Sequence, residues 1–266
     1  MSYQPVLPFT GHSGWAFLQR TREVQQDAFE TSGVIQRVTD RFAEKIGGIT
    51  TPEQLVADRQ LLQVALGAFG LDEDIDSKFF VKEVLASNSF DDKSLAGRLS
   101  DKRYQSMARA FGFGDPLGPQ TGTEGFAAKI IDSYNERQFE IAVGEQDGDM
   151  RLLLGFEREL NTVLDRKVSD NAHWYSIMAT PPLRKVFQTA MNLPDSFGTL
   201  DVDRQLKDFK ARAESMFGAE TVADFADPEI QEKLVQRFLT GSELKQGPSA
   251  SVRGSAALAI LQAGLG

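Results

Sequence analysis

The sequence predicts an all-α protein built of stacked helical hairpins, with weak internal repeats. Apolar residues recur at helical spacing along most of the chain, as they do on the buried face of a helix. β-Branched residues never alternate with polar ones over five or more positions, so no strand is predicted. Three helical runs end alike, because Gly70, Gly112 and Asn192 each stand between an apolar run and a further apolar residue. Gly and Asn tolerate the left-handed conformation that commonly closes a helix, so these endings indicate repeated hairpins.

Three predicted helix starts combine a capping residue with a proline, which needs no N–H partner in the first turn. They are Thr51-Pro52, Thr180-Pro181 and Asp227-Pro228. Gln54 completes a capping box with Thr51, and we expect one helix from there to about Phe69. The helix from Pro228 should end near Leu239, with Gly241 beyond it. Further helices are expected over 15–29, 34–46, 126–143, 150–163, 172–178, 183–193 and 202–217.

Glycine and proline are concentrated in a few segments, which suggest how the chain is organised. Between residues 112 and 125 lie five glycines and two prolines, which favour a loop or hinge between two helical halves. The predicted parts are an extended N-terminal arm (1–13), an N-terminal helical half (14–112), the loop or hinge (113–125), a C-terminal helical half (126–245), a linker (246–254) and a short apolar C-terminal segment (255–266).

Composition excludes several classes of function. The 41% of hydrophobic residues are enough for a core, whereas the net charge of −9 and the lack of a basic patch argue against a nucleic-acid partner. The absence of cysteine removes thiol nucleophiles, thiolate metal sites and disulfides. The N-terminal sequence has no basic region followed by an apolar run, and no later run is long enough to span a bilayer. We therefore expect neither a signal peptide nor a membrane span, and a cytoplasmic location is compatible with this sequence.

Four acidic residues have the spacing of a calcium-binding loop. Asp72, Asp74, Asp76 and Glu83 occupy its first, third, fifth and twelfth positions. Ser77, however, stands where the sharp turn of such a loop requires glycine. The alternative is that these carboxylates complement the positive end of a following helix. We predict no metal site here.

A second candidate site contains one of the two histidines. His173, Trp174 and Tyr175 could line a pocket, although a histidine next to aromatic residues is more often a packing residue. The only other histidine in the sequence is His12, so two histidines alone cannot supply a catalytic triad or a three-histidine metal site. No pair of carboxylates stands out as a general acid and base. The sequence therefore predicts no catalytic residue and no cofactor.

The C-terminal segment is apolar but too short to be a stable free helix. Its large aliphatic side chains are those of Leu258, Ile260, Leu261 and Leu265. The segment could dock on the body of the same chain, dock on a partner, or stay disordered. If it binds a partner, these four residues are the candidates for the contact.

Several motifs resemble those of a known family. They are GWAFL (14–18), DRQLLQVALGAFGL (58–71), NSFDDKSLAGRLSDKRY (88–104), AFGFG (110–114), PPLRKVF (181–187) and LDVDRQL (200–206). Nearly from end to end, the chain resembles an alphaproteobacterial family described as a domain of unknown function, DUF1217, which is often encoded among flagellar genes. The resemblance implies a helical, flagellum-associated protein with flagellar partners, and it supplies no catalytic residues.

Two hypotheses of function follow. The first is a non-enzymatic structural, assembly or accessory protein of the flagellum that acts through protein–protein interaction. The alternative is a helical module that binds a small ligand or a metal. Such a module could be an enzyme. The sequence leaves the partner, the oligomeric state and export open.

Overall fold

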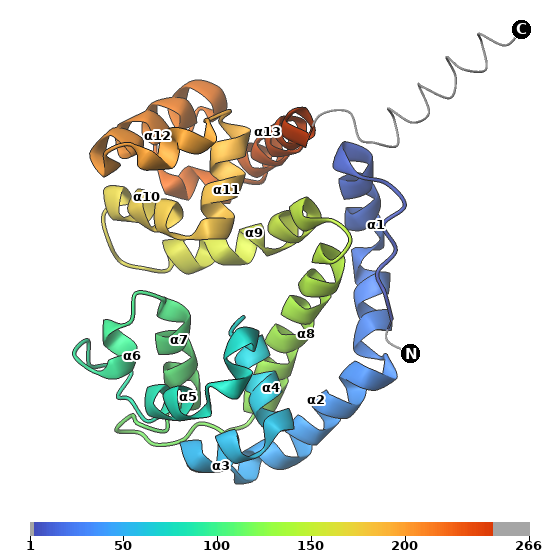
Figure 1. The fold of residues 1–266 in the computed structure, drawn as a ribbon, viewed down its shortest axis with the longest axis vertical. Helices are drawn as coiled ribbons and strands as arrows, with labels where there is room; N and C mark the ends of the chain where they lie inside the picture. The colour runs from blue at the N-terminus through green and yellow to red at the C-terminus, as the bar shows by residue number, and fades with distance from the viewer. Residues whose placement is uncertain (1–2, 247–266) are drawn as a thin grey trace, which may run out of the picture. The chain divides into compact units, whose positions relative to one another are not determined.

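The computed structural model describes residues 3–246 (Figure 1). In this range the chain forms thirteen α-helices, four 3₁₀-helices and no strand, which confirms the predicted all-α class. The α-helices are α1 (Gly11–Glu30), α2 (Gly33–Lys45), α3 (Pro52–Ala57), α4 (Arg59–Ala68), α5 (Lys78–Leu85), α6 (Leu95–Arg98), α7 (Lys102–Phe111), α8 (Phe126–Gly144), α9 (Gly148–Leu164), α10 (Asp170–Ala179), α11 (Pro181–Ala190), α12 (Val202–Phe217) and α13 (Pro228–Gln246). The 3₁₀-helices are η1 (Ile46–Gly48), η2 (Asp72–Asp76), η3 (Asp195–Thr199) and η4 (Val222–Ala226). Across residues 3–246, no helix is both long enough and apolar enough to cross a membrane.

The helices group into two compact units. Unit 1 comprises the N-terminal residues to Val6 together with Thr21–Ala142, and unit 2 comprises Leu7–Arg20 together with the chain from Val143 onward. The division predicted at 113–125 is therefore displaced, because this segment joins α7 to α8 inside unit 1.

The glycine-rich segment 113–125 is a packed loop and not a boundary between halves. A β-carbon on Gly114 would overlap the carbonyl oxygen of Ala86, so this position requires glycine for a close approach of two backbones. Farther along the loop, the Thr121 hydroxyl donates a hydrogen bond of 2.6 Å to the carbonyl oxygen of Ile49. The glycine content thus reports close packing within unit 1.

Unit 1 is built around α4. Seven of the ten residues of α4 are buried, and its leucines and valine join the core formed by α2, α5, α7 and α8. The Tyr134 ring of α8 lies against the backbone of Gly67 in α4, and the Tyr134 hydroxyl is 3.4 Å from the side-chain nitrogen of Gln63. A glycine inside this helix therefore provides room for an aromatic ring.

Unit 2 has an aromatic core centred on Trp174 of α10. The Trp174 ring lies 5.9 Å from Phe187, 6.1 Å from Phe209 and 6.1 Å from Phe225, measured between ring centroids. Phe187 and Phe225 meet edge to face at 4.8 Å. Such aromatic pairs add about 0.5–1.5 kcal/mol each to the stabilisation from burial.

The three predicted helix endings are confirmed. Gly70, Gly112 and Asn192 have φ values of 70°, 68° and 51°, which place all three in the left-handed region. After α4, the amide of Leu71 donates to the carbonyl of Leu66 at 3.0 Å. After α11, Leu193 donates in the same way to Gln188 at 2.9 Å. Both bonds span five residues, which is the Schellman ending.

The helix predicted from Thr51 to about Phe69 is two helices. The capping box of Thr51 and Gln54 is present, but α3 ends at Ala57 and α4 begins at Arg59. Asp58 between them has an extended conformation and accepts hydrogen bonds from the amides of Gln60 and Leu61 at 3.0 and 3.4 Å. An aspartate that caps the second helix therefore interrupts a continuous apolar pattern.

The predicted end of the last helix also needs correction. The helix begins at Pro228 as expected, but α13 continues through Gly241 to Gln246. A β-carbon on Gly241 would stand 2.8 Å from the carbonyl oxygen of Thr189 in α11. Gly241 is therefore needed for close packing of α13 on α11 and does not end the helix.

Candidate functional site

An apolar groove opens on unit 1 where the end of α2 and η1 face the start of α8. We call it the α2–α8 groove; its volume is about 600 Å³. Its lining residues are mostly small or aliphatic: Ala43, Ile46, Gly47, Thr121, Gly122, Thr123, Gly125, Ala127, Ala128, Ile131 and Asp132. Three segments of the chain thus converge on one surface that few large side chains fill.

The helix α8 forms one wall of the groove because of its residue spacing. Ala127, Ala128, Ile131 and Asp132 are separated by one, three and one residues, so they lie on one side of the helix over its first two turns. Ala128 and Asp132 are exposed, whereas Ala127 and Ile131 are partly buried. Alanine at these positions keeps the wall close to the helix backbone.

The opposite wall is held in place by two contacts with the 121–125 loop. The Thr121 hydroxyl donates to the carbonyl of Ile49, just beyond η1. A β-carbon on Gly122 would meet the Gly47 carbonyl at 3.5 Å, an ordinary contact distance. The loop is therefore fixed against η1.

The lining of this groove is mostly apolar and carries few polar groups. Asp132 is the single charged residue among those that line it, and the threonines supply the hydroxyl groups. Small side chains, in contrast, allow the backbone of another helix to approach closely, as at interfaces rich in Gly and Ala.

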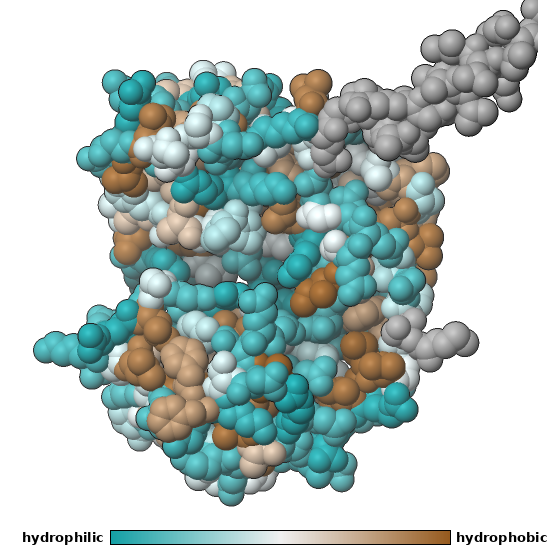
Figure 2. All heavy atoms as spheres, viewed as in Figure 1, coloured by the Kyte–Doolittle hydropathy of each residue, from teal (hydrophilic) through white to brown (hydrophobic). Residues whose placement is uncertain are grey.

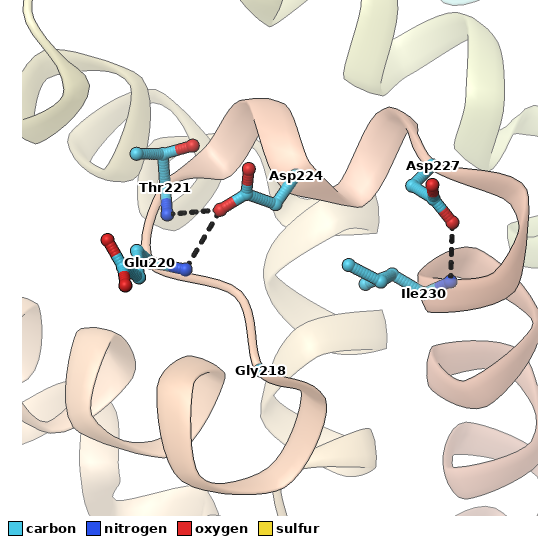
Figure 3. A pocket seen from close by; sticks show the side chains of 6 residues that line it. All are labelled: Gly218, Glu220, Thr221, Asp224, Asp227 and Ile230. Atoms are coloured by element: carbon cyan, nitrogen blue, oxygen red, sulfur yellow. Dashed lines mark hydrogen bonds between the residues drawn. The ribbon is translucent and has the colours of Figure 1, made fainter.

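A second, polar depression lies on unit 2 between the end of α12 and the start of α13 (Figure 3). It has a volume of about 370 Å³ and is lined by Gly218, Glu220, Thr221, Asp224, Asp227 and Ile230. Asp224 accepts hydrogen bonds from the amides of Glu220 and Thr221, both at 2.8 Å. Asp227 accepts from the amides of Glu229 at 2.8 Å and Ile230 at 3.3 Å.

The carboxylates of this depression serve the backbone. The hydrogen bond from the Thr221 amide, together with that from Glu220, holds the pKa of Asp224 below its usual range, although partial burial opposes this effect. The two aspartates each cap a helix: Asp224 completes the capping box of η4, and Asp227 precedes α13. The geometry thus explains the acidic residues as helix caps.

The four acidic residues with calcium-loop spacing do not converge on one point. Asp72 accepts from Gln138 at 2.7 Å and Asp74 from the Tyr104 hydroxyl at 2.6 Å. Asp76 pairs with Arg59 at 2.5 Å, and Glu83 pairs with Lys82 at 3.1 Å. Over residues 3–246, no three His, Cys, Asp or Glu side chains come together as a metal site would require. The first three carboxylates belong to η2 and contact three different helices.

His173, Trp174 and Tyr175, which were predicted to line one pocket, are consecutive residues of α10, so their side chains point in different directions. Trp174 is fully buried in the aromatic core of unit 2. His173 is partly exposed, with its Nε2 atom 2.9 Å from the carbonyl oxygen of Arg166. The Tyr175 hydroxyl donates to Asp203 at 2.7 Å, which raises the pKa of Tyr175. These contacts fit the packing alternative for His173 and Trp174, and neither concavity described above includes them.

The remaining candidates are the large aliphatic residues of the C-terminal segment. Leu258, Ile260, Leu261 and Leu265 lie outside the described residues. The sequence did not single out the α2–α8 groove. Its signal was divided between Gly122 and Gly125, assigned to the predicted loop or hinge, and Ala127 and Ala128, assigned to the helix predicted after it; composition alone does not show what approaches a glycine.

Apolar residues also reach the surface elsewhere, in patches among hydrophilic ones (Figure 2). Phe79 and Phe90 are exposed in unit 1, and a cation lies near each ring. The Lys82 ammonium lies 5.2 Å from the Phe79 ring centroid, and the Arg109 guanidinium lies 5.0 Å from that of Phe90. Each ring therefore has a cation–π partner within the chain.

Comparison with known proteins identifies a similar solved structure and a matching family. An X-ray crystal structure of protein AGR_C_984 from Agrobacterium tumefaciens is similar, with a TM-score of 0.72 and 25% sequence identity over 92% of this chain and 100% of the other. None of the curated proteins that were compared matches the chain. The sequence profile of the family described as "Protein of unknown function (DUF1217)" matches residues 68–230. This match extends over more than half of the chain and includes the three helix endings that the sequence analysis emphasised. The chain therefore belongs to the DUF1217 family.

Proposed function

We propose that this protein is a non-enzymatic interaction protein that binds an apolar helix of a partner in the α2–α8 groove. The observation that carries the proposal is the groove itself, whose volume of about 600 Å³ is bounded by alanine, glycine and isoleucine. Binding a helix in a groove is a common way for a helical protein to recognise a partner, and its affinity comes from buried apolar area.

The residues of the groove specify the chemistry of the partner. Because its walls are formed by small residues such as Ala128 and Gly122, the partner helix should present small and aliphatic side chains that permit a short distance between backbones. Asp132 lies exposed at the same wall, so a lysine or arginine on the partner would be favourable near it. A strongly acidic helix would be disfavoured, since the chain carries a net charge of −9.

The resemblance described above supplies the class of partner. Members of a family that is often encoded among flagellar genes are expected to act with flagellar proteins, as structural, assembly or accessory factors. The assignment as a non-enzyme is supported by the solitary position of Asp132 in the groove and by the capping role of Asp224 and Asp227. In the polar depression, Asp224 and Asp227 both accept hydrogen bonds from backbone amides, so these two carboxylates serve the helix ends.

The variant that tests this proposal is Ala128→Arg. Ala128 is exposed on α8, so arginine can extend into the groove and block it without entering the core. Ala211→Arg is the matched control, because Ala211 is also an exposed alanine within a helix but belongs to α12 of unit 2. Circular dichroism should show equal helix content in both variants.

The readouts are swimming motility and capture of flagellar proteins from motile cells. A strain without the protein should swim poorly, and the Ala211→Arg variant should restore swimming whereas the Ala128→Arg variant should not. The flagellar protein captured by the wild type should likewise be lost with Ala128→Arg alone. Full complementation by Ala128→Arg would remove the groove from the proposal. Normal swimming by the deletion strain would contradict the flagellar assignment.

A further inference from the structure

The backbone of the N-terminal arm is held by the side chain of Gln25 in α1, within unit 1 (Figure 1). The Val6 amide donates to Gln25 Oε1 at 2.6 Å, and Gln25 Nε2 donates to the carbonyl oxygen of Val6 at 3.2 Å. One side-chain amide thus pairs with both backbone groups of one residue, as residues of adjacent strands do. This pairing does not read the Val6 side chain, which is 54% exposed.

The orientation of the Gln25 amide is set from within α1. Gln25 Nε2 also donates to the Thr21 hydroxyl oxygen at 2.8 Å, one turn earlier in the helix. Because an amide nitrogen has two hydrogens, the bonds to Thr21 and to Val6 use both and fix which side of the amide carries the oxygen. Gln25 is also 6% exposed, so its side chain is held by packing. We call Gln25 and Thr21 together the Gln25 clamp.

The part of α1 that carries the clamp has its own contacts with α8. Phe29, one turn after Gln25, meets Phe139 edge to face, with ring centroids 5.8 Å apart. Arg22 pairs with Glu136 at 3.5 Å. These contacts are independent of the arm, so the clamp keeps its position in unit 1 when the arm leaves it.

The arm itself has the features of a bound peptide. Residues 3–6 belong to no helix, and among them Pro5 is buried whereas Gln4 and Val6 are exposed. Proline fixes its own φ and disfavours the helical conformation of the residue before it, so this segment is extended before it binds. A pre-organised segment loses little conformational entropy on binding. The contacts that hold it, one proline side chain and the backbone of the next residue, are ones that another peptide can reproduce.

We propose that the Gln25 clamp is a binding site for an extended, proline-containing peptide of another protein, and that the arm occupies it until such a peptide replaces it. The peptide carries proline directly before the residue whose backbone pairs with Gln25. The arm acts as a tethered competitor, with an effective concentration in the millimolar range. This inference does not depend on the proposed function, because it makes no use of the α2–α8 groove.

The first test removes the competitor and supplies the peptide. A full-length chain without residues 2–6 is titrated with YQPVLP, the sequence of residues 3–8 with both ends blocked, and nuclear magnetic resonance follows the side-chain amide of Gln25. The signals should shift saturably at millimolar peptide. The same peptide with a methyl group on the valine nitrogen should bind about tenfold more weakly, because Gln25 Oε1 then lacks its donor. Equal affinities, or signals that do not shift, would refute the proposal.

A matched pair of variants assigns the binding to the clamp. Gln25→Ala in the shortened chain should weaken the binding of YQPVLP about tenfold or more, since it removes both backbone contacts. Gln26→Ala is the control, because Gln26 is the next residue of α1 and pairs with Glu30 at 2.9 Å. This variant should bind the peptide as the unsubstituted chain does. Equal losses in both variants would remove Gln25 from the site.

The complete chain tests whether the arm can be replaced, and it does so even where the shortened chain does not fold. The protein contains no cysteine, so Gln4→Cys on the exposed side of the arm can carry a single environment-sensitive fluorophore. Addition of YQPVLP should change its fluorescence, at higher concentrations than the shortened chain requires, and the methylated peptide should have little effect. An arm whose fluorescence ignores both peptides is a permanent part of unit 1, which contradicts the proposal. Dimers in sedimentation that disappear without residues 2–6 would assign the site to the arm of a second copy and would likewise overturn it.

Discussion

The aromatic ring of Tyr134 lies so close to the backbone of Gly67 that a β-carbon on Gly67 would stand 2.7 Å from the ring atom Cδ2. This contact joins α8 to the central helix of unit 1 at a position where the ring is almost fully buried. Glycine inside a helix costs about 1 kcal/mol relative to alanine. Its presence in α4 is therefore explained by the space that Tyr134 requires.

We expect Gly67→Ala to destabilise the protein in spite of the better helix propensity of alanine. Overpacking of a well-packed core costs about 1–3 kcal/mol, which exceeds or equals the propensity gain of about 1 kcal/mol. Gly33→Ala is the control, because a β-carbon there would meet nothing within 4 Å. That variant should be stabilised by about 0.4–1 kcal/mol. The urea concentration at the unfolding midpoint should be highest for Gly33→Ala, intermediate for the wild type and lowest for Gly67→Ala. Equal midpoints for the two variants would contradict the steric argument.

The left-handed residue after α11 gives a second prediction. Asn192 has φ 51°, a conformation that costs other L-residues about 1–2 kcal/mol and that glycine adopts freely. Asn192→Ala should therefore lower the thermal midpoint, whereas Asn192→Gly should leave it unchanged or raise it. If alanine and glycine were equally tolerated, the Schellman ending at Leu193 would not depend on the left-handed residue.

These helix endings show what the sequence could predict. Gly70, Gly112 and Asn192 carry their information locally, because a left-handed position selects residue types without regard to distant contacts. The capping box at Thr51 and the extent of α12 were predicted correctly for the same reason. Local rules therefore gave the all-α class and most helix starts.

The errors share one physical cause, which is that a residue type can serve either a local or a long-range contact. Gly241 was interpreted as a helix stop, yet it allows α13 to approach Thr189 of α11. The glycines of 113–125 were interpreted as a loop or hinge between two halves; the segment is a loop, but Gly114 packs against the backbone of Ala86 inside unit 1. The α2–α8 groove was missed for the same reason, because its walls come from segments about eighty residues apart in the sequence. Such contacts depend on tertiary structure and have no local signal.

The pairing of Arg41 with Asp58 leads to a third prediction. Arg41 donates to Asp58 at 2.7 Å and so connects α2 to the cap of α4. Partial burial tends to raise the pKa of Asp58, but the hydrogen bonds from Arg41 and from the amides of Leu61 and Gln60 outweigh it and lower the pKa below its usual range. Replacing Asp58 with alanine should cost about 0.5–2 kcal/mol at neutral pH, as the loss of a helix cap does.

The pH dependence of this variant follows from the sign of the shift. A carboxylate whose pKa is lowered in the folded state stabilises the fold above its unfolded pKa of about 4, and this stabilisation is lost as the pH falls through the folded pKa. The difference in unfolding free energy between the wild type and Asp58→Ala should therefore be constant from pH 5 to 7 and shrink below about pH 4. A difference that grew in acid would show that the ionised form of Asp58 is not the stabilising one.

Tyr104 provides a fourth prediction, at the opposite end of the pH scale. Its hydroxyl donates to Asp74 at 2.6 Å. Burial and this hydrogen bond together raise the pKa of Tyr104 to about 12. Because the unfolded chain releases this proton near pH 10, the contribution of Tyr104 to stability should be present below that pH and be lost as the pH rises toward 12. Nuclear magnetic resonance of ¹³C-labelled tyrosine rings can follow the ionisation of each phenol separately.

Asp74→Asn is the informative variant for Tyr104, since it keeps a hydrogen-bond acceptor but removes the negative charge. The pKa of Tyr104 should fall toward its ordinary value in this variant, although the remaining burial should keep it above that value. Asp203→Asn is the matched control, because Asp203 accepts from Tyr175 and should shift the ionisation of that ring alone. If Asp74→Asn left Tyr104 unchanged, burial alone would account for its high pKa. The Asp74 carboxylate would then have no energetic link to α7, and its place on η2 would need another explanation.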